Sequence, residues 1–216
     1  MSASGNAPVR TSVAAILFYS LSTGLSAQSP AQVFTSPKGE FRMAYSAPLV
    51  RCLRDPTHPV EDGAWLPGSC RREVCEDPAL PSASTVVCVG YAGDEFSQKV
   101  AFGAGAFFVA EVAKASTKEL CLQGERTWNI QSRVGSTIND KSAAQFRTTE
   151  NWMMHSRDSV IERVFNNGAC YEIGIQRVHN STGPFEAGTF KEFTAQDEAT
   201  VQHRLREALQ SFRFLN

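Results

Sequence analysis

Cysteine and histidine are the residue types in this chain best suited to covalent or metal chemistry. The sequence has six cysteines and four histidines among 216 residues. A cysteine nucleophile needs a base within reach and a lowered pKa, whereas a structural zinc site needs paired Cys or His ligands at short spacing. The spacing of these residues therefore decides between a nucleophile, a metal site and disulfide bonds.

Cys170 lies in the stretch "VFNNGACYEIGIQRV", next to a tight turn and several charged residues. His179 is on the same predicted strand, so about 30 Å of extended chain separates it from Cys170. His203 is predicted on the solvent side of a helix, and His155 is the histidine that could fold near Cys170. These positions favour a structural role for Cys170 over a nucleophilic one.

Metal and cofactor motifs are absent from the sequence. "CRREVC" spaces Cys70 and Cys75 too widely for C-x-x-C, and His58 is distant from both. Gly103 and Gly105 lack the third glycine of a dinucleotide fingerprint, and strand residues follow them where a helix would be needed. We find neither a G-x-S-x-G elbow nor an H-E-x-x-H motif. The sequence therefore predicts no catalytic residue, no metal site and no cofactor.

The first residues match an export signal. Arg10 precedes the apolar run "VAAILFYSLSTGL", and small residues follow in "SAQS". This pattern predicts a signal peptide over 1–27 with cleavage after Ala27. The apolar run is shorter than the roughly 20 residues that span a bilayer. We expect a single mature domain over 28–216, secreted or periplasmic in a bacterium, without a membrane span.

The cysteines fit an oxidising compartment, because an even number in an exported chain indicates disulfides. Four of them bracket a segment, 54–83, that has five prolines and little periodicity: Cys52, Cys70, Cys75 and Cys88. We predict that these four pair among themselves and hold that loop, and all three pairings remain open. By elimination, Cys121 is predicted to bond Cys170.

Composition narrows the classes of partner. Hydrophobic residues make up 42% and charged residues 20% of the chain, as in a globular protein. The formal net charge of −1 gives no electrostatic reason to expect nucleic acid as a partner. The expected partner is an unknown envelope or extracellular protein, or a small ligand.

Periodicity predicts a mainly β chain with two helices. A short helix should follow a capping box at Ser116–Glu119, and an amphipathic helix should cover 195–213 with Val201 and Leu205 on its apolar stripe. Strands with turns are predicted over 33–46, 84–92, 106–112, 144–156 and 159–165.

Asn167-Gly168 is a strong hairpin signal, because both positions tolerate the positive φ of a type I′ turn. A turn centred there sets Arg163 opposite Glu172 and Phe165 opposite Cys170. The apolar side chains then share one face, which is predicted to be the core. The other face would carry the Arg163–Glu172 ion pair, worth roughly 0.2–1 kcal/mol.

Three segments, "PKGEFRMAYS", "RVFNNGACYEIGI" and "LQSFRFL", together resemble the PsbP-like α/β/α sandwich superfamily. "NGACYEI" and "GTFKEFTAQDEA" are also similar to small exported bacterial proteins of uncharacterised function. The resemblance covers most of 33–216. It implies an α+β fold, in which a C-terminal helix and a short second helix pack on a central antiparallel sheet.

Proteins of this fold are mostly accessory or binding subunits, and no ligand residues carry over from them. We therefore expect an exported, non-catalytic binding or accessory domain. The alternative is an envelope hydrolase whose catalytic residues are dispersed along the chain. Fold alone does not separate the two.

Overall fold

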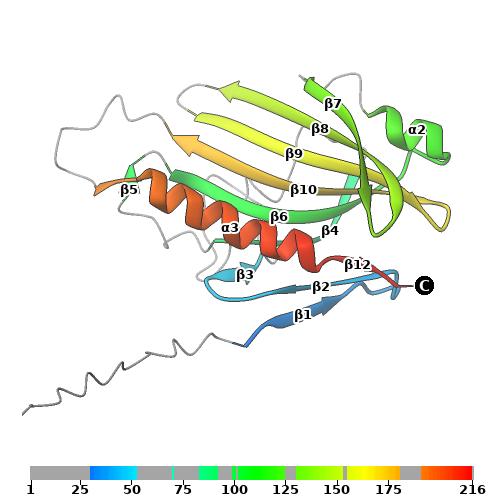
Figure 1. Ribbon diagram of the computed structural model, residues 1–216, viewed down its shortest axis with the longest axis horizontal. Helices are drawn as coiled ribbons and strands as arrows, with labels where there is room; N and C mark the ends of the chain where they lie inside the picture. The colour runs from blue at the N-terminus through cyan, green and yellow to red at the C-terminus, as the bar shows by residue number, and fades with distance from the viewer. Residues whose placement is uncertain are drawn as a thin grey trace, which may run out of the picture.

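The structure is a computed structural model. It describes residues 30–52, 70, 83–91, 99–100, 102–124, 130–152, 155–180 and 191–215. The predicted signal peptide over 1–27, almost all of the predicted loop over 54–83, Cys75 and His58 lie outside the described residues. In the described part the chain is α+β, with a large antiparallel sheet, smaller sheet elements and two helices (Figure 1).

Seven strands form the large sheet, and every neighbouring pair in it is antiparallel. In spatial order they are β3 (Leu49–Arg51), β4 (Ala83–Tyr91), β6 (Phe102–Val112), β10 (Ala169–Asn180), β9 (His155–Asn166), β8 (Lys141–Trp152) and β7 (Ile130–Ile138).

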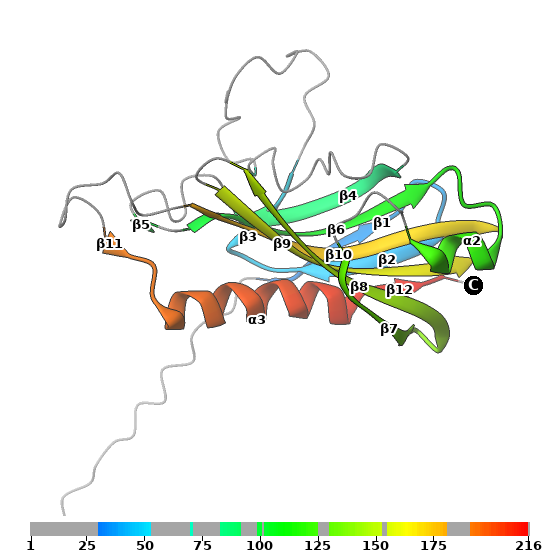
Figure 2. The same ribbon diagram turned by 90° about the horizontal axis from the view of Figure 1, so that it is seen from above.

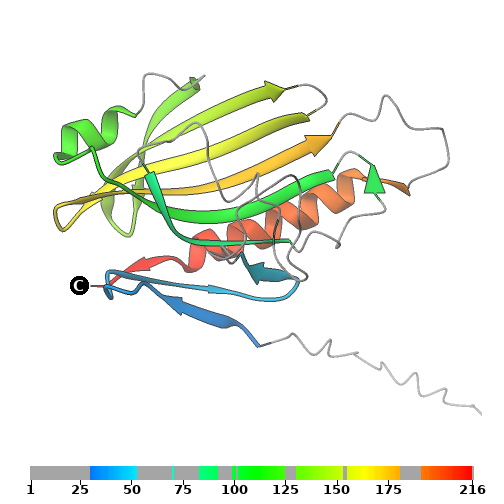
Figure 3. The ribbon, with the colours of Figure 1, turned by 180° about the vertical axis from the view of Figure 1, so that it is seen from behind.

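A smaller sheet joins the two ends of the described chain. Its order is β1 (Gln32–Thr35), β2 (Phe41–Tyr45) and β12 (Arg213–Phe214), and it lies beside the large sheet (Figure 3). The strand–turn–strand predicted over 33–46 is therefore present as β1 and β2. A short parallel pair, β5 (Lys99–Val100) with β11 (Lys191–Glu192), completes the strands described.

Helix α3 (Ala195–Ser211) begins at a capping box in which Thr194 and Asp197 satisfy each other's backbone N–H groups. It runs along one face of the large sheet (Figure 2) and contacts β2, β6 and β10. Val201, Leu205 and Ala208 are buried in one hydrophobic cluster with sheet residues such as Phe107 and Ile173.

Two glycines of β6 allow a close approach of neighbouring elements, Gly105 to α3 and Gly103 to β10. A Cβ built on Gly105 would lie 3.2 Å from Val201 Cγ1, and one on Gly103 would lie 2.8 Å from the Val178 carbonyl oxygen. The absence of a side chain at these two positions therefore admits close packing. The strand predicted to start at residue 106 starts at Phe102, because both glycines are part of β6.

Helix α2 (Lys118–Gln123) contacts β8, β9 and β10. The predicted cap at Ser116 is wrong by one residue: Thr117 is the N-cap, and its side chain accepts a hydrogen bond from the Leu120 N–H at 3.2 Å. Starting at Lys118, the helix turns Cys121 into a buried cluster with Val112 and Ala115.

The hairpin of β9 and β10 has the register predicted from its turn. Asn167 and Gly168 have positive φ, Arg163 lies opposite Glu172, and Phe165 lies opposite Cys170. The single strand predicted over 144–156 is wrong, because β8 ends at Trp152 and β9 begins at His155.

The expectation that only one face of this hairpin is core is also wrong. Arg163 and Glu172 are 1% and 0% exposed, and Arg163 Nε donates to Glu172 Oε1 at 2.6 Å. Helix α2 and the Cys121–Cys170 bridge lie near this part of the sheet, so both of its faces are buried. The hydrophobic pattern showed only the face that packs toward the main cluster.

Two disulfides have both partners among the described residues: Cys52–Cys70, and the expected bridge Cys121–Cys170, whose Cα atoms lie 5.5 Å apart. Cys88 is also disulfide-bonded. Disulfides are typical of an oxidising compartment. None of the described helices is long and apolar enough to cross a bilayer.

Candidate functional site

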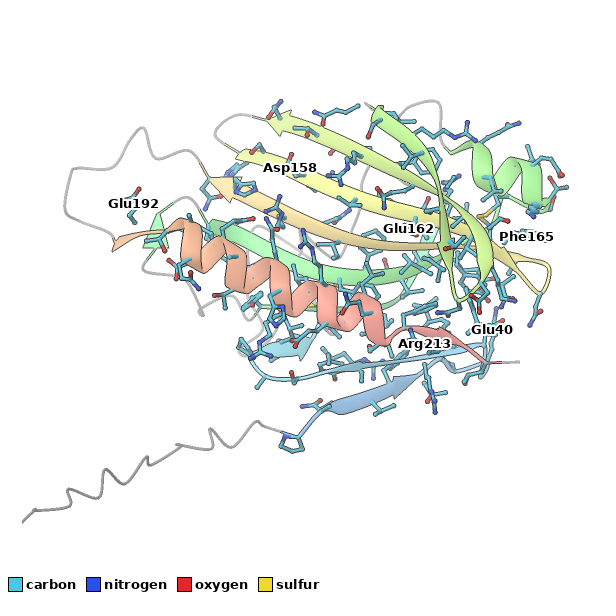
Figure 4. All side chains as sticks on the ribbon, viewed as in Figure 1. Glu40, Asp158, Glu162, Phe165, Glu192 and Arg213 are labelled. Carbon is cyan, nitrogen blue, oxygen red and sulfur yellow. A yellow bond between two sulfur atoms is a disulfide. The ribbon has the colours of Figure 1, made fainter. Side chains whose placement is uncertain are left out.

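The face of β7, β8 and β9 that lies beside α3 is polar and partly exposed. It is the same face that α3 contacts on β6 and β10. Side chains there include Ser132, Val134 and Arg147, all exposed or half-buried. Figure 4 shows Asp158 and Glu162 on β9, alongside α3 rather than beneath it. We call this surface the open face.

A cluster of polar side chains lies at the end of the open face nearest the start of α3. Strand register aligns Thr149 with Asp158 and Asp158 with Arg177. Thr149 Oγ1 donates to Asp158 Oδ1 at 2.7 Å. His179 Nε2 lies 3.4 Å from Asp158 Oδ2, and Arg177 forms an ion pair with Glu198 of α3. Three strands and one helix therefore contribute to this polar cluster.

Burial lowers the pKa of two basic side chains in the polar cluster. Desolvation is the larger cause for His179, the Arg177 charge adds to it, and Asp158 opposes both. Desolvation also lowers the pKa of Arg177, where Asp158 opposes it and Arg206 reinforces it. Burial thus favours the neutral form of His179, whose ring has the Asp158 carboxylate on one side. Perturbed pKa values of this kind gather at functional sites, although structural ion-pair networks produce them too.

A histidine held by an aspartate is two-thirds of a hydrolytic triad. The third member, a nucleophile hydrogen-bonded to the histidine, is absent from the described part of the chain. The nearby hydroxyl of Thr149 donates to Asp158 and not to His179. The arrangement can therefore bind a polar group or accept a proton, but it does not activate a nucleophile among the residues described.

A second polar group lies further along the open face. Glu162 accepts hydrogen bonds from Ser136 Oγ and from Gln145 Nε2, both at 3.1 Å. These three residues come from three neighbouring strands. Glu162 is thus half-buried and held by neutral partners. It adds a carboxylate to a surface on which the nearby Arg147 is exposed.

The histidines and cysteines that the sequence singled out do not come together. His155 was the histidine expected to approach Cys170, but it pairs with Asn180 at the opposite end of β10. His203 is 69% exposed on α3, as expected. Cys170 is buried and bonded to Cys121, so a thiol–histidine pair at this position is excluded. Across the described residues, no group of His, Cys, Asp and Glu side chains could hold a metal ion.

Sequence reasoning missed the polar cluster, although one signal for it was present. The register set by Asn167-Gly168 places Asp158 opposite Arg177, two ionisable residues on one face of the hairpin. The partners on the other elements, Thr149 and Glu198, required the register of β8 and the position of α3, which the sequence does not supply.

Comparisons with known proteins give similarity at the level of fold. No family model matches the chain, and no curated protein matches it. Solved structures that are similar include a Bacteroides thetaiotaomicron protein at 12% identity, covering 88% of this chain and 49% of that one, with a TM-score of 0.44. This chain thus spans about half the length of that protein.

Two further similar structures are the cyanobacterial PsbP (CyanoP) of Synechocystis and the Ran-binding protein Mog1p of Saccharomyces cerevisiae. CyanoP is 8% identical, with 89% of this chain and 96% of that chain covered and a TM-score of 0.40. Mog1p is 13% identical, with 86% and 95% covered and a TM-score of 0.37. The resemblance to PsbP-like proteins expected from the sequence thus recurs, and at these scores no function is taken from it.

Proposed function

We propose that this chain is an exported, non-catalytic binding or accessory domain, and that the open face beside α3 is its binding surface. The observation that carries the proposal is the polar cluster, which joins Thr149, Asp158, Arg177 and His179 of the sheet to Glu198 of α3. It presents donors and acceptors at a partly exposed surface, with no activated nucleophile among the described residues. The ligand is an envelope or extracellular protein or a small polar molecule.

Export is part of the same proposal. Its supports are the predicted signal peptide over 1–27, whose residues lie outside those described, and the disulfides of the folded domain. We also propose that α3 and α2 are the two helical layers of a PsbP-like sandwich. Their contacts support this, because α3 touches β6 and β10, whereas α2 touches mainly β9.

One observation favours the alternative, an envelope hydrolase. His179 has a lowered pKa and lies against Asp158, as a general base would. A hydrolase would need its nucleophile from a segment beyond the described residues. This alternative predicts turnover that depends on His179, whereas the binding domain predicts none.

The test compares two aspartate variants of the mature protein. Asp158→Asn removes the carboxylate of the polar cluster, and Asp140→Asn is the matched control. Asp140 is exposed in the β7–β8 turn at φ 63°, a conformation that Asn tolerates. Each variant is immobilised and incubated with envelope extract, and the captured molecules are identified by mass spectrometry. We expect a ligand retained by the parent and by Asp140→Asn but lost with Asp158→Asn.

Hydrolysis is measured in parallel with p-nitrophenyl acetate and p-nitrophenyl phosphate. We expect no turnover above that of a heat-denatured sample. Turnover that disappears in His179→Gln would contradict the proposal and favour the hydrolase. If the parent, Asp140→Asn and Asp158→Asn all captured the same ligand equally, the open face would not be the binding surface.

A further inference from the structure

Strand β7 is an edge strand of the large sheet as the described residues form it. It is the last strand in the spatial order, and of the described strands only β8 pairs with it. Most of its nine residues are exposed or half-buried, and Val134 at its centre is 53% exposed. An exposed edge offers unpaired backbone N–H and C=O groups to another strand.

The turn before β8 determines which backbone groups point outward. Asn139 and Asp140 both have positive φ, as in a two-residue type I′ turn, and Ile138 lies opposite Lys141. Ile138 and Lys141 are therefore a hydrogen-bonded pair, and the pairs alternate from there. The N–H and C=O groups of Arg133, Gly135 and Thr137 consequently point away from β8, toward whatever lies beside the edge.

The sequence of β7 is close to a palindrome about Val134. Reading "IQSRVGSTI" outward from that valine, serine meets serine at 132 and 136, and isoleucine meets isoleucine at 130 and 138. A strand that pairs antiparallel with its own copy about Val134 thus sets like side chains against like. The outermost isoleucines do not keep this register, because β7 has a register shift between Ile130 and Ser132.

The backbone groups that point away from β8 are in the right positions for self-pairing centred on Val134. Pairing about Val134 sets Arg133 opposite Gly135 of the second copy, and these are residues whose N–H and C=O groups point outward. The two valines then form the pair without hydrogen bonds, in which Cα atoms lie about 4.5 Å apart and side chains are closest. Burying both removes an exposed apolar side chain from water in each copy.

Charge does not oppose this pairing. Arg133 is the only charged residue of β7, and self-pairing sets it opposite a glycine. Its Nη2 donates to the Leu122 carbonyl at 2.5 Å, and its guanidinium lies 5.7 Å from the ring centroid of Phe146. Edge strands that avoid association often carry lysine or proline, and β7 has neither.

We propose that β7 is the interface of a symmetric homodimer, in which the strand pairs antiparallel with its own copy about Val134. The two large sheets join into one continuous sheet through a twofold axis. This assignment goes beyond the binding function proposed above. It does not depend on the polar cluster that carries that function, because the β7 edge and the polar cluster share no residue, although Ser132 and Val134 of the edge also lie on the open face.

The first test is the mass of the mature protein in solution, measured by sedimentation up to millimolar concentration. We expect a dimer for the parent and for Val134→Thr, which keeps a β-branched residue. In Val134→Lys two like charges face each other across the axis, so we expect a dissociation constant at least about tenfold higher. A parent that stays monomeric, or a dimer that survives Val134→Lys unchanged, overturns the proposal.

The second test measures register with two matched cysteine variants, oxidised by copper phenanthroline. Val134→Cys sets two thiols opposite each other, within the roughly 7 Å between Cα atoms that a disulfide allows. In Ser132→Cys the thiols would be about 14 Å apart along the pair. We expect a cross-linked dimer from the first variant only, with the 134–134 bond identified by peptide mapping.

Two more results, one from cross-linking and one from hydrogen exchange, also decide the proposal. Equal cross-linking of the two variants refutes pairing about Val134. A monomer whose Arg133 and Gly135 amides are nonetheless protected from hydrogen exchange would mean that another segment covers the edge, which also overturns the homodimer.

Discussion

The buried Arg163–Glu172 pair allows a sharp test of how this sheet is covered. In Arg163→Met the Glu172 carboxylate, which is 0% exposed, loses its cationic partner. Breaking a buried pair in this way costs about 3–5 kcal/mol, because a buried charge is left uncompensated. For a domain of this size each kcal/mol shifts the melting temperature by about 2–4 °C. We therefore expect a fall of about 6–20 °C.

The assay is equilibrium unfolding in urea with the disulfides intact, supported by calorimetry. The matched control is Arg204→Met, which breaks the exposed Arg204–Glu207 pair on α3 and should cost no more than about 1 kcal/mol. The double variant Arg163→Met/Glu172→Leu should recover most of the loss, since an apolar pair fills the same space without a charge.

Two results would refute this reasoning. A cost below about 1 kcal/mol for Arg163→Met would place the pair in solvent, as the hydrophobic pattern alone suggested. Additive losses in the double variant would show that the two side chains do not interact.

Three further variants test other parts of the structure. Leu205→Ala should cost about 2–5 kcal/mol in urea unfolding, because Leu205 is fully buried between α3 and the sheet; a loss below half that range would argue against close packing of the helix. In Cys121→Ser, the Cys170 thiol should react with a maleimide only after denaturation, and the melting temperature should fall, since closing a loop of 49 residues is worth about 4 kcal/mol; rapid labelling of the native variant would contradict the burial of Cys170. The pKa of His179 is lower in the folded state, so the unfolded chain takes up a proton first as the pH falls, and stability is lost from about pH 6.5 downward through that lowered pKa. In paired unfolding curves, His179→Gln should therefore lose less stability than the parent between about pH 7 and about pH 5. If the two proteins lost stability in parallel, His179 would not be the cause.

Local features of this fold could be read from the sequence because short-range chemistry determines them. Asn167-Gly168 gave the register of the longest hairpin residue by residue, since both positions tolerate the left-handed conformation of its turn. The apolar stripe of α3 was visible for a similar reason, because it depends on residues within a few positions of one another.

The second cover of the sheet could not be read in the same way. Arg163 and Glu172 look like a surface pair, because their strands alternate apolar and polar residues. Their burial depends on α2, which comes some forty residues before Arg163 in the chain. The polar cluster is similarly non-local, because Glu198 lies beside Arg177 only when α3 is packed on the sheet.

The small sheet has a consequence for the time at which the domain completes its fold. Strand β2 lies between β1 and β12, and Ser211 Oγ accepts a hydrogen bond from the Ala44 N–H at 2.8 Å, 167 residues away in sequence. During synthesis, β2 can pair with β1 long before α3 and β12 leave the ribosome. Phe41 and Met43, which are buried in the finished domain, therefore stay uncovered by these last elements until residues 195–214 have been made. Until then, the apolar face of this strand lacks its final cover, and exposed apolar strands of this kind are prone to aggregation.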